Sequence, residues 1–172
     1  MRTRLKLFRG RTRAAWFGVI LCGMFAGNVD AQGIGYAVAG AGGVSGFFGS
    51  RSSAYHAAGG GEFRFATRAG IGAEGGVFGN SGSLLVMVSA NGTFHVSRSP
   101  GERGPSPFLT GGYTRLGIGY GEGAFNTWNL GGGVAIWGNG RSGFRLEFRD
   151  HVRPDFRGTV HYWVVRAGVC LR

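Results

Sequence analysis

Cysteine is scarce in this sequence, which excludes two classes of protein. Only Cys22 and Cys170 are present, and Cys22 lies in a segment that we expect to be removed. One remaining cysteine cannot form an intramolecular disulfide, so the chain is not a disulfide scaffold. The histidines share no metal-ligand spacing with Cys170 or with one another, so we predict neither a metal site nor a cofactor. They are His56, His95, His151 and His161.

Lysine and acidic residues are also few. Beyond residue 31 the cations are thirteen arginines, set against seven acidic residues, for a net charge of +6. The arginines are spread over many segments and form no basic stripe, which argues against nucleic-acid binding. Glycine is abundant, at 37 residues, but it alternates with large apolar residues and shows no Gly-X-Y repeat. The composition therefore indicates a folded chain rather than a disordered or collagen-like one.

Long apolar runs are absent, and the longest lies near the N-terminus. Ala14–Ala26 has 13 residues, fewer than the roughly 20 that a spanning helix needs. It follows a basic head and precedes Val29-Asp30-Ala31, which places small residues where a signal peptidase reads them. We predict a secretory signal peptide at 1–31 and a mature domain at 32–172. The alternatives are an N-terminal membrane anchor and a lipidated Cys22, and Leu21 before that cysteine disfavours the lipidated form.

Beyond residue 32 apolar and polar residues alternate with a period of two, and no amphipathic helix is indicated. Along 143–150 apolar and charged residues alternate: Phe144, Arg145, Leu146, Glu147, Phe148 and Arg149. In a strand such residues point to opposite faces. Eight runs of this kind can be counted, at 33–41, 56–67, 69–77, 84–96, 107–117, 127–138, 142–150 and 159–171.

The connections between these runs alternate in length. Residues 67–69 and 138–142 are tight, and the second contains Asn139-Gly140, a favoured hairpin turn. Residues 42–55 and 118–126 are longer and suit external loops, while 97–106 is long for a turn on the opposite side. An even number of strands of this length is typical of bacterial outer-membrane barrels. We predict an all-β fold, an eight-stranded antiparallel up-and-down transmembrane β-barrel.

The apolar face of each strand would then contact lipid, and the charged face would fill the lumen. A closed barrel pairs every backbone group, as a membrane requires. Buried charges need partners, so we expect a structural ion network inside the barrel. Its members are Glu62, Arg64, Glu74, Arg145, Glu147, Arg149 and Arg166. An anion site at Arg145, Glu147 and Arg149 is the less favoured alternative.

Several short sequence segments resemble those of the small outer-membrane β-barrel proteins, a family akin to the transmembrane domain of outer-membrane protein A. They are Gly-Gly-Gly-Glu-Phe-Arg-Phe (59–65), Asn-Gly-Thr-Phe-His (91–95), Pro-Phe-Leu-Thr-Gly-Gly-Tyr (107–113), Asn-Leu-Gly-Gly-Gly-Val (129–134) and Arg-Leu-Glu-Phe-Arg-Asp-His (145–151). The resemblance covers about 33–172 and implies a non-enzymatic bacterial outer-membrane barrel serving envelope structure or surface contact. It implies as partners outer-membrane lipid, lipopolysaccharide and the barrel-assembly machinery, with a monomeric state. The chain departs from that pattern by ending Leu171-Arg172 rather than in an aromatic residue.

Two other functions remain open. His95-Val96-Ser97 resembles the His-x-Ser spacing of outer-membrane lipid A deacylases, in which the two side chains share one strand face. We expect this pair to be a polar inner face running into a turn instead. A soluble secreted β-barrel that binds a small apolar ligand would reverse the two faces. Tyr113, Trp128, Tyr162 and Trp163 are predicted to form an aromatic girdle at the membrane interface.

Overall fold

The computed structural model describes residues 32–46, 51–79, 82–96, 103–118, 123–138, 141–156 and 158–172. The predicted signal peptide, the Asn139-Gly140 turn and Ser97 lie outside these ranges. No helix among the described residues is long and apolar enough to cross a membrane.

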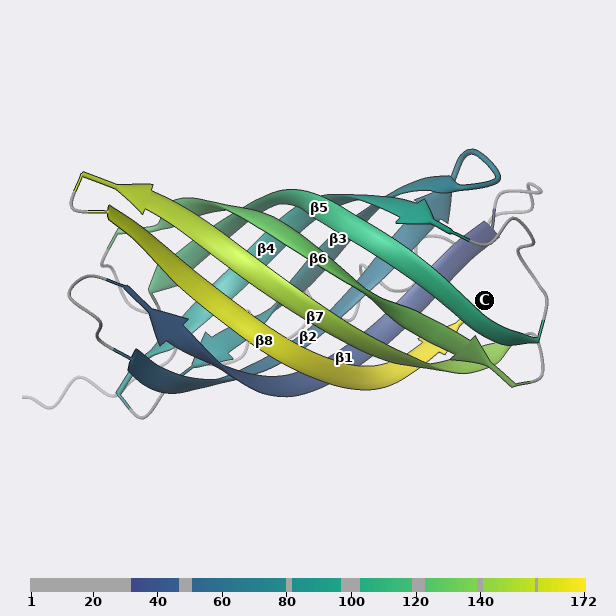
Figure 1. The fold of residues 1–172 in the computed structure, drawn as a ribbon, viewed down its shortest axis with the longest axis horizontal. Helices are drawn as coiled ribbons and strands as arrows, with labels where there is room; N and C mark the ends of the chain where they lie inside the picture. The colour runs from purple at the N-terminus through teal and green to yellow at the C-terminus, as the bar shows by residue number, and fades with distance from the viewer. Residues whose placement is uncertain are drawn as a thin grey trace, which may run out of the picture.

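Eight antiparallel strands follow one another and close into a barrel (Figure 1). They are β1 (Gln32–Ser45), β2 (Arg51–Arg64), β3 (Ala69–Gly79), β4 (Leu84–His95), β5 (Gly104–Ile118), β6 (Phe125–Trp137), β7 (Ser142–Asp155) and β8 (Gly158–Leu171). Each strand pairs with the next, and β8 pairs with β1. The predicted eight-stranded up-and-down barrel is confirmed.

Strand alternation sorts the side chains as the sequence pattern predicts. On β7, Arg145, Glu147 and Arg149 are at most 3% exposed, whereas Phe144 and Phe148 are 48% and 49% exposed. The charged face therefore lines the interior, and the apolar face looks outward. The soluble alternative predicts the reverse orientation, with the phenylalanine and valine face inside.

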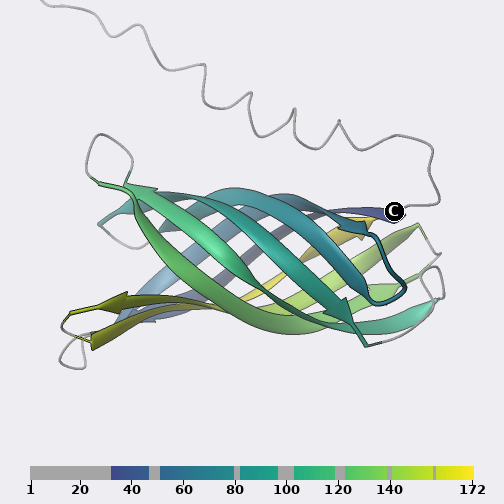
Figure 2. The same cartoon turned by 90° about the horizontal axis from the view of Figure 1, so that it is seen from above.

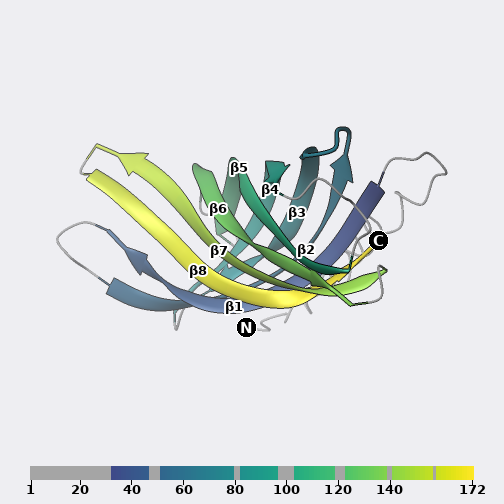
Figure 3. The same ribbon diagram turned by 45° about the vertical axis from the view of Figure 1, so that its right-hand side comes forward.

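The two ends of the barrel differ. The start of β1 lies beside the end of β8, with Gly35 opposite Leu171, and we refer to this end as the terminal end. The turn at 65–68 and the ends of β4 and β6 are also there, while β1, β3, β5 and β7 end at the opposite, distal end. Figures 2 and 3 show the steep tilt of the strands between these ends and the β7–β8 hairpin at the distal end.

Several strands are longer than predicted. β1 continues to Ser45 and β2 begins at Arg51, so most of 42–55 is strand rather than loop. Glycine and serine hide the alternation there, yet the backbone still pairs, as at Gly43 opposite Ser53. β7 likewise runs to Asp155 and meets β8 at Gly158, whose φ of +129° is one that side chains other than glycine rarely adopt.

The other two predicted loops shorten in the same way. The segment 118–126 contracts because β5 reaches Ile118 and β6 begins at Phe125. The long segment 97–106 contracts because β5 begins at Gly104 and includes Pro105 near its start, where a strand tolerates proline.

Glycine on the inner face makes room for the largest polar side chains. Gly40 on β1 lies opposite Arg166 on β8. A Cβ atom on Gly40 would lie 2.7 Å from Arg166 Cβ, which is too close for any real side chain. The absence of a side chain at this position lets the arginine extend across the barrel.

Candidate functional site in the barrel interior

All seven charged residues predicted for the lumen lie inside the barrel. Glu62, Arg64, Glu74, Arg145, Glu147, Arg149 and Arg166 are each at most 6% exposed. They come from β2, β3, β7 and β8, and their side chains form two groups along the barrel axis.

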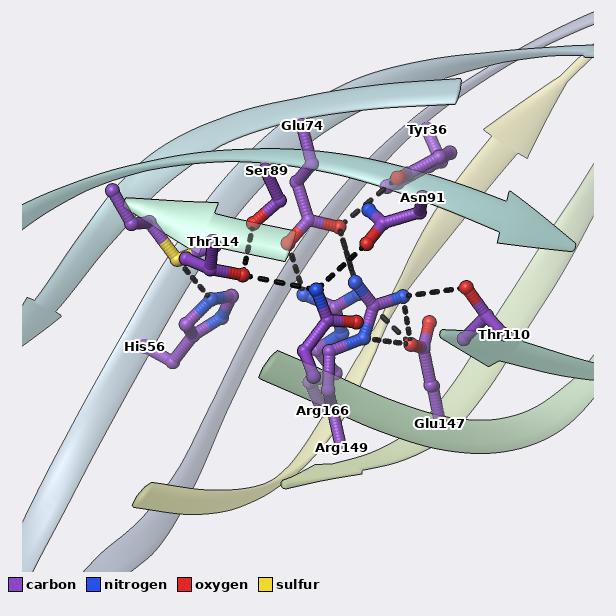
Figure 4. Close-up of polar contacts among 12 residues, drawn as sticks. Tyr36, His56, Glu74, Ser89, Asn91, Thr110, Thr114, Glu147, Arg149 and Arg166 are labelled. Carbon is purple, nitrogen blue, oxygen red and sulfur yellow. Dashed lines mark hydrogen bonds and ion pairs between the residues drawn. The ribbon is translucent and has the colours of Figure 1, made fainter. Parts of the chain in front are cut away.

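The larger group is centred on Glu74 of β3. Arg166 of β8 reaches across the barrel and donates two hydrogen bonds to the Glu74 carboxylate, at 2.6 Å to Oε1 and 2.7 Å to Oε2 (Figure 4). The Tyr36 hydroxyl donates to Oε2 at 3.0 Å. Two parallel guanidinium hydrogen bonds form the strongest type of ion pair in proteins.

A second carboxylate completes this group. Glu147 accepts hydrogen bonds from Arg145 at 2.9 Å, from Arg149 at 2.7 Å and from Arg166 at 2.9 Å. Arg149 also lies 3.9 Å from Glu74. Three arginines therefore share two carboxylates, and we refer to Glu74, Glu147, Arg145, Arg149 and Arg166 as the central network.

Two aromatic rings pack against Arg145 of the central network. The Arg145 guanidinium carbon lies 4.5 Å from the centre of the Tyr36 ring and 4.0 Å from that of Phe108. Both distances are typical of cation–π contacts. These rings help to stabilise the positive charge that the network carries in excess.

The smaller group lies toward the terminal end. Glu62 Oε1 is 2.5 Å from His95 Nε2, and an Arg64 guanidinium nitrogen contacts His95 Nδ1. Because arginine can only donate, this contact makes Nδ1 an acceptor and places the ring proton on Nε2, toward Glu62. Both nitrogens of His95 are therefore engaged.

Arg172, just beyond β8, lies at the terminal end of the barrel. Its guanidinium carbon lies 3.7 Å from the centre of the Trp137 ring. Burial, together with the positive charge of Arg64, lowers the pKa of Arg172 from its ordinary value. Cations are thus crowded at the terminal end.

A neutral polar layer lies on the distal side of the central network. The Thr114 hydroxyl contacts Ser89 at 2.8 Å, Asn129 at 3.0 Å and His151 at 3.1 Å. The amides of Asn91 and Asn129 hydrogen bond to each other. His56 Nε2 lies 3.1 Å from the Met87 sulfur, within reach of a weak hydrogen bond.

An apolar layer fills the interior beyond these polar residues. Its buried members are Ala54, Phe78, Met87, Leu116 and Val164. Tyr162 packs edge-on against Phe78, with ring centres 5.8 Å apart. The prediction that Tyr162 belongs to an outer girdle is therefore wrong. By strand parity it faces inward with Arg166, while Tyr113, Trp128 and Trp163 are 40–63% exposed outside.

Three comparisons with known proteins bear on this architecture. No family model matches the chain, and no curated protein matches it either. Solved structures do match. The chain is similar to Neisserial surface protein A, with a TM-score of 0.61 and 15% identity, covering 83% of this chain and 99% of that one.

Two further structures agree. The N-terminal β-barrel domain of Pseudomonas aeruginosa OprF matches with a TM-score of 0.59 and 15% identity, covering 82% of this chain and 98% of that one. A de novo designed transmembrane β-barrel matches at 0.52 and 13% identity, covering 81% and 93%.

The fold is that of the small outer-membrane β-barrels. Such low identity establishes the fold alone, so the function must be argued from the residues of this chain. In this barrel the inner side chains form packed layers, as expected where eight strands leave just enough room for side chains.

The deacylase alternative is not supported by this geometry. A base that activates serine needs a free ring nitrogen, and both nitrogens of His95 already contact Glu62 and Arg64. His95 is also only 3% exposed and faces the lumen rather than lipid. Among the described residues, no group of three His, Cys, Asp or Glu side chains is placed to hold a metal ion.

Sequence reasoning missed several members of this interior. Tyr36 was not assigned to a face, because its segment consists mainly of glycine and alanine. His56 and His151 could have been found by counting in twos from Glu62 and Arg149, since both share the parity of those residues. Neither their contacts with Met87 and Thr114 nor those between distant strands can be read from period two.

Proposed function

We propose that this chain is a non-enzymatic integral protein of the bacterial outer membrane. In this proposal residues 1–31 are a cleaved signal peptide and 32–172 form the barrel, inserted as a monomer by the barrel-assembly machinery. The terminal end faces the periplasm, and the distal end faces the outside. The seven-residue lumen network is structural, and the protein serves envelope structure or surface interaction without nucleic acid or a cofactor.

The observation that carries this proposal is the outer surface. Large apolar side chains from every strand but β1 are exposed, including Ile71 at 57%, Val88 at 62%, Leu109 at 58% and Val169 at 58%. Soluble proteins rarely expose apolar patches larger than a few hundred Å². A surrounding hydrocarbon layer removes the cost of this exposure, and the paired backbone of a closed barrel suits that layer.

The interior supports a structural role. The two carboxylates of the central network contact three arginines, and layers of polar and apolar side chains lie on either side of it. In the part of the chain that the structure describes, the Thr114 hydroxyl contacts His151, yet Thr114 and His151 are both 0% exposed. A substrate has no route to an enclosed pair, so the contact serves packing.

Heat-modifiability tests the proposal directly. The mature chain, refolded in detergent or lipid vesicles, should migrate differently on a gel before and after boiling, and the folded form should float with vesicles. N-terminal sequencing of protein from bacterial outer membranes should begin at Gln32. A stable monomer in plain buffer would contradict the membrane assignment, and an intact Met1 would contradict the cleaved leader.

A further inference from the structure

Every carboxylate side chain in the described residues already has a basic partner. Glu62, Glu74 and Glu147 are paired with arginines inside the barrel. Nearer the distal end, Asp150 Oδ2 on the outer face lies 2.6 Å from His161 Nδ1, and Asp155 lies 3.4 Å from Arg153.

Two arginines on the outer face near the distal end take no part in these ion pairs. Arg115 donates a hydrogen bond to the side-chain oxygen of Asn126, at 3.4 Å, and among the described residues neither Arg115 nor Arg51 forms an ion pair with a carboxylate. Each is near exposed aromatic residues on the same face. Arg115 is two residues beyond Tyr113, whose ring packs edge-on against Trp128 with centres 5.4 Å apart.

Arg51 differs from Arg115 because it lines a groove of about 460 Å³. Gly43 on β1 forms the floor, opposite Ser53 on β2 and Trp163 on β8. A Cβ atom at Gly43 would lie 3.1 Å from the Ser52 carbonyl oxygen and 3.2 Å from the Trp163 ring, so a side chain at this position would crowd the indole that borders the groove. Ser45 and Arg51 continue the groove toward the distal rim.

These groups match one kind of ligand. An unpaired guanidinium binds phosphate oxygens through two parallel hydrogen bonds. Serine hydroxyls donate to and accept from sugar hydroxyls, and an exposed indole provides a flat apolar surface with a polar edge. A wall of a barrel at the level where lipid meets water presents such a groove to headgroups rather than to acyl chains.

We propose that the groove formed by Gly43, Ser45, Arg51, Ser53 and Trp163 binds the phosphorylated sugar headgroup of lipopolysaccharide. This site deepens the proposed function and rests on it, because only an outer-membrane barrel with its distal end outward meets that lipid. The guanidinium of Arg51 supplies the charge, and Gly43 leaves room for the Trp163 indole beside it.

Native mass spectrometry of the mature barrel in detergent tests the site. The probes are lipid A carrying both phosphates, lipid A stripped of phosphate, and phosphatidylglycerol. We expect the bisphosphorylated lipid A to bind most tightly. Arg51→Gln should weaken it about tenfold, as expected for the loss of charge-assisted hydrogen bonds. Gly43→Val should cause a similar loss, because its side chain would displace the Trp163 indole from the groove.

Arg115→Gln is the matched control, since it removes the same charge from the same outer face outside the groove. It should change lipid A binding less than twofold. Equal losses for Arg51→Gln and Arg115→Gln would reveal general charge attraction and overturn the site. Equal binding of dephosphorylated lipid A or of phosphatidylglycerol would also overturn it.

Failure of the site is distinguishable from failure of the proposed function. Each variant is first checked for heat-modifiability, and a variant that does not fold is replaced by Ser53→Ala or Arg51→Lys, which should weaken binding by a smaller factor. A wild-type barrel that is heat-modifiable but shows no preference for bisphosphorylated lipid A refutes the groove alone. A wild-type chain that is soluble without detergent refutes the membrane assignment itself.

Discussion

Arg166 on β8 and Glu74 on β3 meet across the interior of the barrel, although 92 positions separate them in the chain. Their two hydrogen bonds, at 2.6 and 2.7 Å, join strands that are not neighbours in the sheet. Both side chains are almost completely enclosed, at 0% and 2% exposure. This pair connects opposite walls, whereas backbone hydrogen bonds connect only adjacent strands.

Removing one partner of this pair should be costly. Glu74→Gln removes one of the two carboxylate charges that Arg166 and Arg149 share and leaves Glu147 as their remaining anion, and breaking a buried ion pair in this way typically costs about 3–5 kcal/mol. The measurement is the urea dependence of the heat-modifiable form in lipid vesicles. A loss below about 1 kcal/mol, the range of exposed pairs, would contradict a buried network.

Removing both partners should cost less than the sum of the two single changes. In Glu74→Gln combined with Arg166→Gln, neither charge is left buried without the other, so the cycle should show a coupling of about 1–3 kcal/mol. The same urea titrations on the two single variants and the double variant supply this value. Additive losses would mean that the two residues contribute independently.

The inner-face glycines should tolerate even a methyl group poorly. A Cβ on Gly168 would meet the Ala37 carbonyl oxygen and Val38 Cα, both backbone atoms that cannot turn aside. Gly168→Ala should therefore destabilise the barrel by about 1–3 kcal/mol, as overpacking usually does. Gly75→Ala is the control, because nothing lies within 4 Å of its added Cβ. Equal stability of the two variants would contradict this close approach.

A charge on the outer face distinguishes lipid from water. Leu109 is 58% exposed in the central part of β5. Leu109→Arg should destabilise a membrane-embedded barrel by about 2–4 kcal/mol, the cost near the bilayer midplane. In a soluble barrel an exposed substitution usually changes stability by less than about 0.5 kcal/mol. Phe156→Arg, in the distal turn, is the control and should have little effect.

His95 should matter for stability and not for catalysis. His95→Ala removes the contacts to Glu62 and Arg64 and should cost about 1–3 kcal/mol, because buried charged partners are left unsatisfied. The wild-type barrel incubated with lipid A should release no fatty acid. Fatty-acid release that disappears in His95→Ala would restore the deacylase alternative.

The alternation of apolar and polar residues was enough to predict most of the fold. Alternation such as Phe144, Arg145, Leu146 and Glu147 predicts both a strand and its two faces, and a set of eight such runs can close without free edges. Strand ends were harder to predict. Around Gly43 and Ser53 the side chains are too small to signal a face, and the pairing depends on backbone groups that every residue carries.

The interior could be predicted only in part. Parity placed Glu74 and Arg166 in the lumen, but their contact depends on the register of β8, β1, β2 and β3, which no local pattern encodes. For Tyr162 the prediction itself was wrong. Its type and its place near a strand end suggested a membrane interface, while its parity with Arg166 placed it inside, and parity was the better guide.

The meeting of Glu74 and Arg166 across the barrel also constrains the order of assembly. The acceptor lies on the third strand and its main donor on the last, so the carboxylate cannot be neutralised by Arg166 until β8 has been laid against β1. Any half-built sheet therefore holds ionised groups that lack their counterparts, and exposing them to hydrocarbon is expensive. Closure of the ring and neutralisation of its centre are thus the same event, which opposes the insertion of partial barrels.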